Sequence, residues 1–309
     1  MTESVLHRQT EADDQQSQSQ EQIRRLVWKL CVATLILMAI GSATRVMNAG
    51  LACPDWPLCY GQIVPTKQMN LQVFLEWFHR LDAALIGIGA LALTSLSWWN
   101  RRYLPTWLPF ASTFALCLII FQGVLGALTV TELLRFDIVT AHLGTALLFF
   151  TTLLVIGTVL TPYQGTGTAL KLPWLSLSAA VLVYLQSLLG ALVGSRWALH
   201  HCLAGQQCGI VYSHIIGVLP PTLATMTLVF LSWRTPALHP ALRRLANMAG
   251  GLLVLQVVLG IATFRLHLQV EPLTVAHQAI GATLLGSLVA FTVLALRDTP
   301  RGIAYQGSP

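Results

Sequence analysis

Long apolar runs separated by short polar breaks follow the chain from about residue 26 to residue 296. Each run has roughly the 20 apolar residues that a helix needs to cross a bilayer. The breaks contain residues that end helices, such as Pro105, Pro162 and Pro236. The pattern predicts eight transmembrane helices, over about 26–46, 72–99, 106–130, 138–161, 173–195, 209–233, 241–264 and 273–296.

The composition excludes an ordinary soluble protein. Of the 309 residues, 55% are hydrophobic and 10% are charged, and the mean hydropathy is +0.66. A soluble domain has about 25% charged residues. The isoelectric point of about 9.2 does not indicate nucleic-acid binding, because the Lys and Arg residues are scattered in ones and twos. The partner that the composition implies is membrane lipid.

The charges predict the orientation of the chain in the membrane. Residues 1–22 are polar and rich in Gln and Ser, which predicts a disordered cytoplasmic tail and no cleaved signal peptide. With this tail inside, the inner segments hold 12 Lys and Arg residues and the outer segments hold 6. The positive-inside rule therefore places both termini in the cytoplasm and the long loop 47–71 outside.

A helical hairpin is repeated four times along the chain. The odd-numbered spans share a Gln four residues before a Gly, and each even-numbered span has one His near its outer start. The phrases with Gln are FQGVLGALT (121–129), LQSLLGALV (185–193) and LQVVLGIAT (255–263), and LMAIGSATR (37–45) is a degraded version. We expect an all-α membrane protein with two pseudo-symmetric four-helix bundles, residues 23–162 and 163–309.

Four intramembrane histidines lie at similar predicted depth, one in each even-numbered span: His79, His142, His214 and His277. Ionisable groups in membranes usually face the bundle interior, and two imidazoles across a four-helix bundle suit axial ligation of heme iron. Zinc fits less well, because it needs three or four converging ligands. Interhelical hydrogen bonding by the four histidines is the alternative. Small residues after the histidines, such as Gly217 and Gly281, leave room for a macrocycle or another helix.

One carboxylate breaks the fourfold pattern. Glu76 lies three residues before His79 and shares its helix face, whereas the matching positions in the other hairpins are Val139, Val211 and Thr274. A carboxylate in an apolar site can act in acid–base chemistry. The alternative is a salt bridge to Arg80 or Arg45. Among the arginines at the outer membrane face, Arg80 is the best candidate to bind a heme propionate, because it adjoins His79.

Two cysteine pairs lie in the outer loops, each with a spacing of six residues. We expect disulfides between Cys53 and Cys59 and between Cys202 and Cys208, because these loops face an oxidising compartment. Redox exchange by the first pair is the functional alternative.

Several of these segments together resemble one family, the heme A synthases. They are GSATRVMNAGLACPDWPLCYG (41–61), EWFHR (76–80) and the three later His phrases, and the resemblance extends from about residue 24 to residue 297. It implies oxidation of the C8 methyl group of heme O to a formyl group by successive hydroxylations, giving heme A for terminal oxidases.

The resemblance also implies roles for individual residues. Glu76 is expected to be catalytic, His79 and His142 to hold the substrate heme O, and His214 and His277 to ligate a heme b cofactor. A location in the bacterial inner membrane and a heme O synthase as the donor of substrate follow from the same resemblance. The electron donor and the formation of a homo-oligomer stay open.

Two other functions use the same four histidines. A di-heme b-type cytochrome linked to quinol would relay electrons without any modified heme, and it needs no counterpart of Glu76. A heme transporter would release its heme and catalyse nothing, and repeats of this kind are common in transporters. The heme recovered from the protein separates these functions from heme A synthesis.

Overall fold

A computed structural model describes residues 2–194, 209–266 and 269–299, with the backbone alone for residues 2–14. All regular elements among these residues are α-helices. Eight spans are long and apolar enough to cross a membrane, as the sequence predicted. The helices are α1 (Thr2–Val46), α2 (Leu71–Trp99), α3 (Leu108–Thr131), α4 (Phe136–Leu160), α5 (Leu172–Val193), α7 (Gly209–Gly217), α8 (Leu219–Arg234), α9 (Pro240–Arg265) and α10 (Glu271–Arg297).

The first helix begins much earlier than the sequence predicted. The expected disordered tail at 1–22 is corrected by the structure, which continues α1 back to Thr2. The physical reason is that no Gly or Pro interrupts residues 2–40, while Gln and Glu are good helix formers. Glu21 adds ion pairs to Arg24 and Arg25, one turn further along the same helix.

The sixth span is divided into two helices. The sequence predicted one helix over 209–233, but α7 ends at Gly217 and α8 begins at Leu219. Pro220 and Pro221 follow directly, and neither has an N–H to bond the carbonyl group four residues earlier. The break therefore lies just after His214, within the same membrane span.

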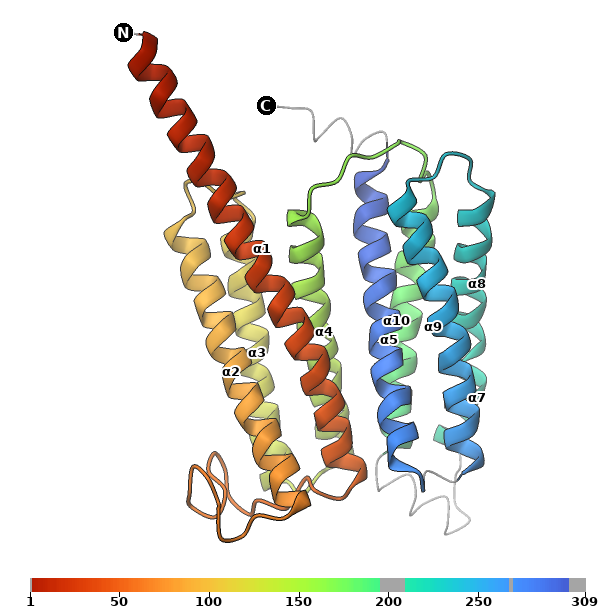
Figure 1. The fold of residues 1–309 in the computed structure, drawn as a ribbon. Helices are drawn as coiled ribbons and strands as arrows, with labels where there is room; N and C mark the ends of the chain where they lie inside the picture. The colour runs from red at the N-terminus through yellow and green to blue at the C-terminus, as the bar shows by residue number, and fades with distance from the viewer. Residues whose placement is uncertain (1, 195–208, 267–268, 300–309) are drawn as a thin grey trace.

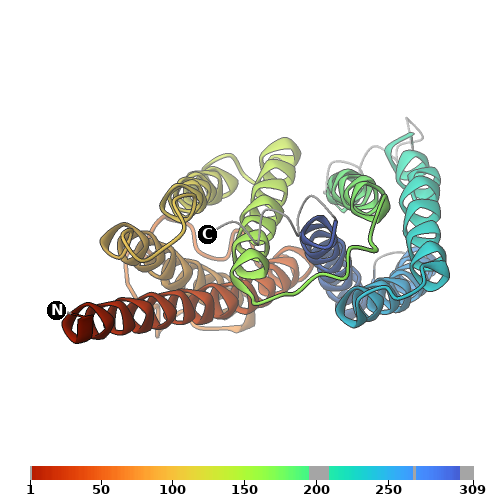
Figure 2. The ribbon, with the colours of Figure 1, turned by 90° about the horizontal axis from the view of Figure 1, so that it is seen from above.

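The helices pack into two rings of four spans, which lie side by side in Figure 2. In the first ring α1 contacts α2, α2 contacts α3, α3 contacts α4, and α4 returns to α1. In the second ring α5 contacts α8, α8 contacts α9, α9 contacts α10, and α10 returns to α5. Contacts of α10 with α1 and α4, and of α4 with α5, join the rings.

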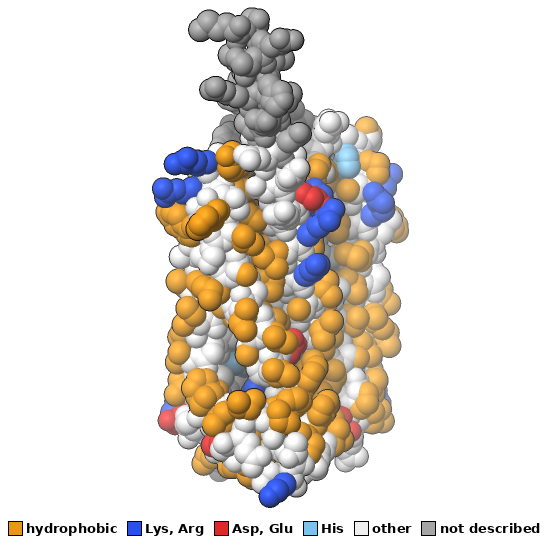
Figure 3. Space-filling view, turned by 60° about the vertical axis from the view of Figure 1, so that its left-hand side comes forward, with side chains coloured by type: hydrophobic (Ala, Val, Ile, Leu, Met, Phe, Trp, Pro, Cys, Tyr) orange, Lys and Arg blue, Asp and Glu red, His pale blue; other side chains and the backbone are white. Residues whose placement is uncertain are grey.

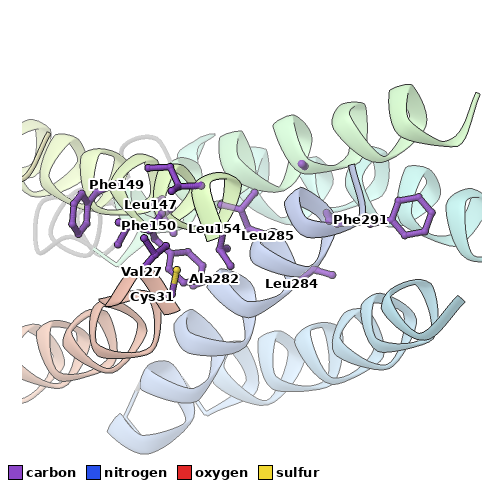
Figure 4. Packing of buried hydrophobic residues seen from close by; sticks show 14 of the residues in the cluster. Val27, Cys31, Leu147, Phe149, Phe150, Leu154, Ala282, Leu284, Leu285 and Phe291 are labelled. Carbon is purple, nitrogen blue, oxygen red and sulfur yellow. The ribbon is translucent and has the colours of Figure 1, made fainter. Parts of the chain in front are cut away.

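Helices α4 and α10 form the centre of the molecule. More than half of the apolar window is buried in each of these two spans (56%), compared with 11% in α3. Figure 4 shows side chains of α1, α4 and α10 packed together, among them Val27, Phe150 and Leu285. Gly286 permits this close approach, because a Cβ there would lie 3.0 Å from the side chains of Phe150 and Leu154.

The surface and the chain ends agree with a membrane-spanning arrangement. Figure 3 shows hydrophobic side chains over the middle of the molecule and Lys and Arg side chains gathered near the end where α1 begins. The end of α10 lies at that same end, whereas the loop between α1 and α2 lies at the opposite end (Figure 1). Asp298 caps α10 and accepts hydrogen bonds from the backbone N–H groups of Thr166, Thr168 and Ala169, which fixes the connection between the rings.

Candidate functional site

Each of the four histidines packs against a glycine of the preceding span in its own ring. A Cβ built on Gly41 would lie 2.7 Å from Cε1 of His79, and one on Gly126 would lie 3.4 Å from Cε1 of His142. In the second ring, Cβ atoms on Gly190 and Gly260 would each lie 3.0 Å from Cε1 of His214 and His277, respectively. The contact is therefore the same four times, and the absent side chain makes room for the imidazole.

The histidines stand on helices that are diagonal within each ring. Helices α2 and α4 carry His79 and His142 in the first ring, with α1 and α3 between them. Helices α7 and α10 carry His214 and His277 in the second ring. This arrangement fits two imidazoles that approach one centre from opposite sides of a four-helix ring.

The repeated glutamines hold the histidines or their backbone. Gln186 lies with its Nε2 3.0 Å from Nδ1 of His214 and donates to the His214 carbonyl at 2.7 Å. Gln256 Nε2 lies 3.4 Å from Nε2 of His277. In the first ring Gln122 donates only to the carbonyl of His142, at 2.9 Å. Residue 37, at the matching place beside His79, is leucine.

Three of the four histidines have a buried imidazole nitrogen without a hydrogen-bond partner among the described residues. They are the Nδ1 atoms of His79, His142 and His277. Interhelical hydrogen bonding, the alternative function for these histidines, therefore leaves a buried ring nitrogen unused in three cases. A heme iron bound at Nε2 leaves Nδ1 in the same state, so the unpaired Nδ1 atoms do not decide between hydrogen bonding and ligation.

The side chains of the EWFHR segment, near the start of α2, make two kinds of contact. His79 faces Gly41 of α1, whereas Glu76, Trp77 and Arg80 hold the loop above the helix. Trp77 Nε1 donates to the carbonyl of Ile63 at 2.7 Å. Helical spacing puts both His79 and Arg80 on the side of Glu76, and the hydrogen bonds from Cys53 and Arg80 direct the carboxylate to the loop instead of to His79.

Glu76 is buried, with 3% of its surface exposed, and both of its oxygen atoms are hydrogen-bonded. Oε1 pairs with Nη2 of Arg80 at 2.5 Å, and Oε2 accepts the backbone N–H of Cys53 at 2.8 Å. The salt bridge that the sequence left open is thus formed with Arg80 and not with Arg45. The pair with Arg80 and the hydrogen bond from Cys53 fix the orientation of the carboxylate.

The expected Cys53–Cys59 disulfide is confirmed, with its Cα atoms 4.8 Å apart. Asp55 accepts the backbone N–H groups of Tyr60 and Gly61 at 2.6 and 2.7 Å. The hydrogen bond from Gly61 is the main reason why the pKa of Asp55 lies below its usual range. The disulfide and Asp55 therefore close a compact loop, and this loop places the Cys53 N–H over Glu76. The second predicted disulfide, Cys202–Cys208, lies outside the described residues.

The guanidinium of Arg80 is hydrogen-bonded to carbonyl groups of the disulfide loop. Its Nη1 donates to the carbonyls of Asp55 and Leu58, both at 2.6 Å, while Nη2 donates to Glu76 and to the Cys53 carbonyl. The sequence favoured Arg80 as a propionate ligand, and that role stays a prediction. In the structure, the Nη1 and Nη2 donors of Arg80 already have protein partners.

Sequence reasoning missed the contact between the glycines and the histidines. The signal was present, because Gly41, Gly126, Gly190 and Gly260 repeat in step with the four histidines. The small residues after the histidines turn out to admit another helix. Cβ atoms on Gly217 and Gly281 would lie 2.6 and 3.0 Å from the amide groups of Gln186 and Gln256.

The fold and the site define a multi-pass α-helical membrane protein with two four-span rings and a histidine pair on diagonal helices of each. Comparison with known proteins identifies the family. The family model described as cytochrome oxidase assembly protein matches residues 24–289, and the chain belongs to this family.

Individual relatives match along most of the chain. The heme A synthase of Shewanella oneidensis is 30% identical, with 86% of this chain and 95% of that protein covered. The heme A synthase of Caulobacter vibrioides is 27% identical, with 86% and 94% covered. The resemblance found in the sequence is therefore confirmed.

Proposed function

We propose that this chain is a heme A synthase that oxidises the C8 methyl group of heme O to a formyl group. One observation carries the proposal: a single hairpin of the fourfold repeat has a buried carboxylate beside its histidine, and a disulfide loop is hydrogen-bonded to that carboxylate. An electron-relay cytochrome has no use for this asymmetry. The relatives named heme A synthase support the same function.

The two histidine pairs take different hemes in this proposal. His79 and His142 orient the substrate heme O, and His214 and His277 ligate a heme b cofactor. The residues fit such ligands, because the two histidines of each ring stand on diagonal helices and a glycine faces each imidazole. Within the described residues no group of three or more His, Cys, Asp or Glu converges, so the donor set suits a centre with two protein ligands.

Glu76 is the residue that acts on the substrate. Its carboxylate is fixed by Arg80 and by the Cys53 N–H, so its orientation is set before the substrate binds. In this position it accepts or returns a proton at the oxidised carbon or stabilises developing positive charge. The heme b held by the second pair supplies electron transfer when bound.

The membrane arrangement completes the proposal. Both termini lie in the cytoplasm of a bacterial inner-membrane protein, and the disulfide loop and Glu76 lie near the outer face. Heme O enters sideways from the lipid, delivered by a heme O synthase. Two successive hydroxylations, each removing two electrons from the methyl carbon, give a diol that loses water, so the conversion requires an electron acceptor and an oxygen source that this chain does not itself supply.

Analysis of extracted hemes after co-expression with a heme O synthase tests the function. We expect heme A, with hydroxylated heme as an intermediate, beside heme B. Heme B alone would favour the electron-relay cytochrome. Absence of any heme would contradict the ligand roles of the histidines and favour the transporter.

The variant Glu76→Gln tests the carboxylate itself. Gln keeps an oxygen that can accept the Cys53 N–H but cannot exchange a proton, so we expect heme A to fall roughly 100-fold or more while heme B is retained. Glu132→Gln is the matched control, because Glu132 is exposed at the end of α3 and pairs only with Arg135 among the described residues. Full conversion by Glu76→Gln would contradict the assignment of Glu76.

A further inference from the structure

Arg45 is a half-buried cation that the proposed mechanism leaves without a task. It lies in the last turn of α1, and its Nε atom is buried with no hydrogen-bond partner. Within the described part of the chain, its Nη2 donates to Oε1 of Gln278 at 3.4 Å. A neutral amide at that distance does not compensate a guanidinium that has been taken out of water.

The position of Arg45 links the two rings. Its helix belongs to the first ring, but its guanidinium reaches Gln278 of α10, the residue directly after His277. On the other side lies Gly194 at the end of α5, where a Cβ would be 3.0 Å from Nη2. The guanidinium thus contacts residues of α5 and α10, two helices of the second ring, and α10 also carries His277.

The charge of Arg45 has no carboxylate partner among the side chains that the structure describes. Among the described residues no Asp or Glu lies within ion-pair distance of Arg45, in contrast to Arg80, which has Glu76. Residues 195–208 and 267–268 contain no Asp or Glu at all. A half-buried guanidinium with a free Nε donor, no acid in reach among the described residues and a glycine at one side is suited to a carboxylate brought by a ligand.

We infer that Arg45 binds a propionate carboxylate of the heme held by His214 and His277. The inference rests on the proposed function, which places a heme b at that pair. It moves the propionate-binding role from Arg80, whose donors are occupied, to Arg45. A residue of the substrate ring would then hold the cofactor of the other ring, so occupancy of the second ring would stabilise the contact between the rings.

The test compares heme with its dimethyl ester, which lacks the propionate charges. Full-length protein with His79→Ala and His142→Ala binds heme at the second pair only, and the affinity for each heme is measured by titration of the Soret band. We expect this protein to prefer the free acid, and Arg45→Gln to reduce the preference about ten- to a hundredfold. Arg45→Lys should keep part of it, because an ammonium binds a carboxylate without the bidentate geometry.

The controls separate a binding role from a structural one. Arg102→Gln removes the same charge from an exposed loop after α2 and should leave the preference unchanged. The midpoint potential of the bound heme should fall in Arg45→Gln, because a nearby cation favours the reduced form, and it should not change in Arg102→Gln. If Arg45→Gln does not elute as a folded, monodisperse protein, the preference and potential of Arg45→Lys decide the question.

Three outcomes would overturn the inference. An equal preference in Arg45→Gln and the parent would show that Arg45 does not bind the carboxylate, while heme bound at the second pair would leave the proposed function intact. Arg45→Gln can also be combined with His214→Ala and His277→Ala, so that heme binds at the first pair only. If Arg45→Gln abolished the preference for the free acid in that background alone, the carboxylate would belong to the substrate heme. No heme at either pair in the parent protein would overturn the proposed function and this inference with it.

Discussion

The two rings share one hairpin plan but differ in what surrounds their histidines. In the second ring a glutamine amide lies within 3.4 Å of a ring nitrogen of both His214 and His277. In the first ring neither histidine has such a contact: Gln122 reaches only a carbonyl, and Leu37 replaces the glutamine beside His79. The first ring has Glu76 and the disulfide loop instead.

This difference shows how one scaffold can supply two kinds of site. Glutamines that hold the imidazoles favour a permanently ligated cofactor, because fixed second-shell partners orient the ligand. A pair of histidines without such partners, beside a fixed carboxylate, is better suited to a substrate that must enter and leave. The comparison rests on a few substitutions at equivalent positions, and each can be tested separately.

Removal of one histidine pair at a time should have the largest effect on the hemes that the two rings bind. We expect the double variant His79→Ala, His142→Ala to lose heme A formation and to retain heme b. The double variant His214→Ala, His277→Ala should lose heme b. Extracted hemes are quantified by chromatography. Loss of the same heme from both variants would show that the rings do not divide the two tasks.

A methyl group added next to His79 should have the next largest effect. Gly41→Ala places a Cβ 2.7 Å from the imidazole, and overpacking of this kind costs about 1–3 kcal/mol. We expect roughly 5- to 150-fold weaker heme O binding. Gly126→Ala is the control within the same ring, because its Cβ would lie at an ordinary contact distance of 3.4 Å from His142. Equal losses in both variants would refute the steric explanation.

Loss of the disulfide should reduce heme A formation several-fold without affecting heme b. The variant Cys53→Ser, Cys59→Ser frees the loop that holds the Cys53 N–H on Glu76, so the carboxylate becomes less well oriented. Cys117→Ser is the control, because Cys117 is an exposed free thiol on α3. Heme A and heme B are measured together, and unchanged heme A would show that the loop does not position Glu76.

The smallest expected effect concerns the pH dependence of the same loop. The pKa of Asp55 is lower in the folded loop than in an unfolded chain, mainly because of the hydrogen bond from Gly61. The ionised form therefore stabilises the loop above the unfolded pKa, and this stability is lost as the pH falls through the folded pKa, below about pH 4. Hydrogen exchange at residues 53–62 should rise only there.

Asp55→Asn should remove that acid-dependent step and raise the exchange moderately at neutral pH. Residues 147–157 of the buried helix α4, which contain no ionisable side chain, serve as an internal reference in the same experiment. A step of equal size in Asp55→Asn would mean that another group controls the loop.

Several features could be predicted from the sequence because they depend on local pattern. The eight spans and the Cys53–Cys59 disulfide agree with the structure, whereas the roles of the four histidines stay predictions. The prediction of a disordered tail at 1–22 was wrong, since polar composition was given more weight than the absence of helix-breaking residues. The break after Gly217 was also missed, although Pro220 and Pro221 were visible in the sequence.

The sequence by itself determined the spans, because a membrane requires every backbone group to be bonded within a helix, and an apolar run of sufficient length meets that requirement alone. Only the tertiary structure decided which arginine stays available to a ligand. Arg80 finds Glu76 one helical turn away, whereas Arg45 meets Gln278 at a separation of 233 residues. Such contacts depend on how the rings pack against each other, and no local pattern of residues encodes that packing.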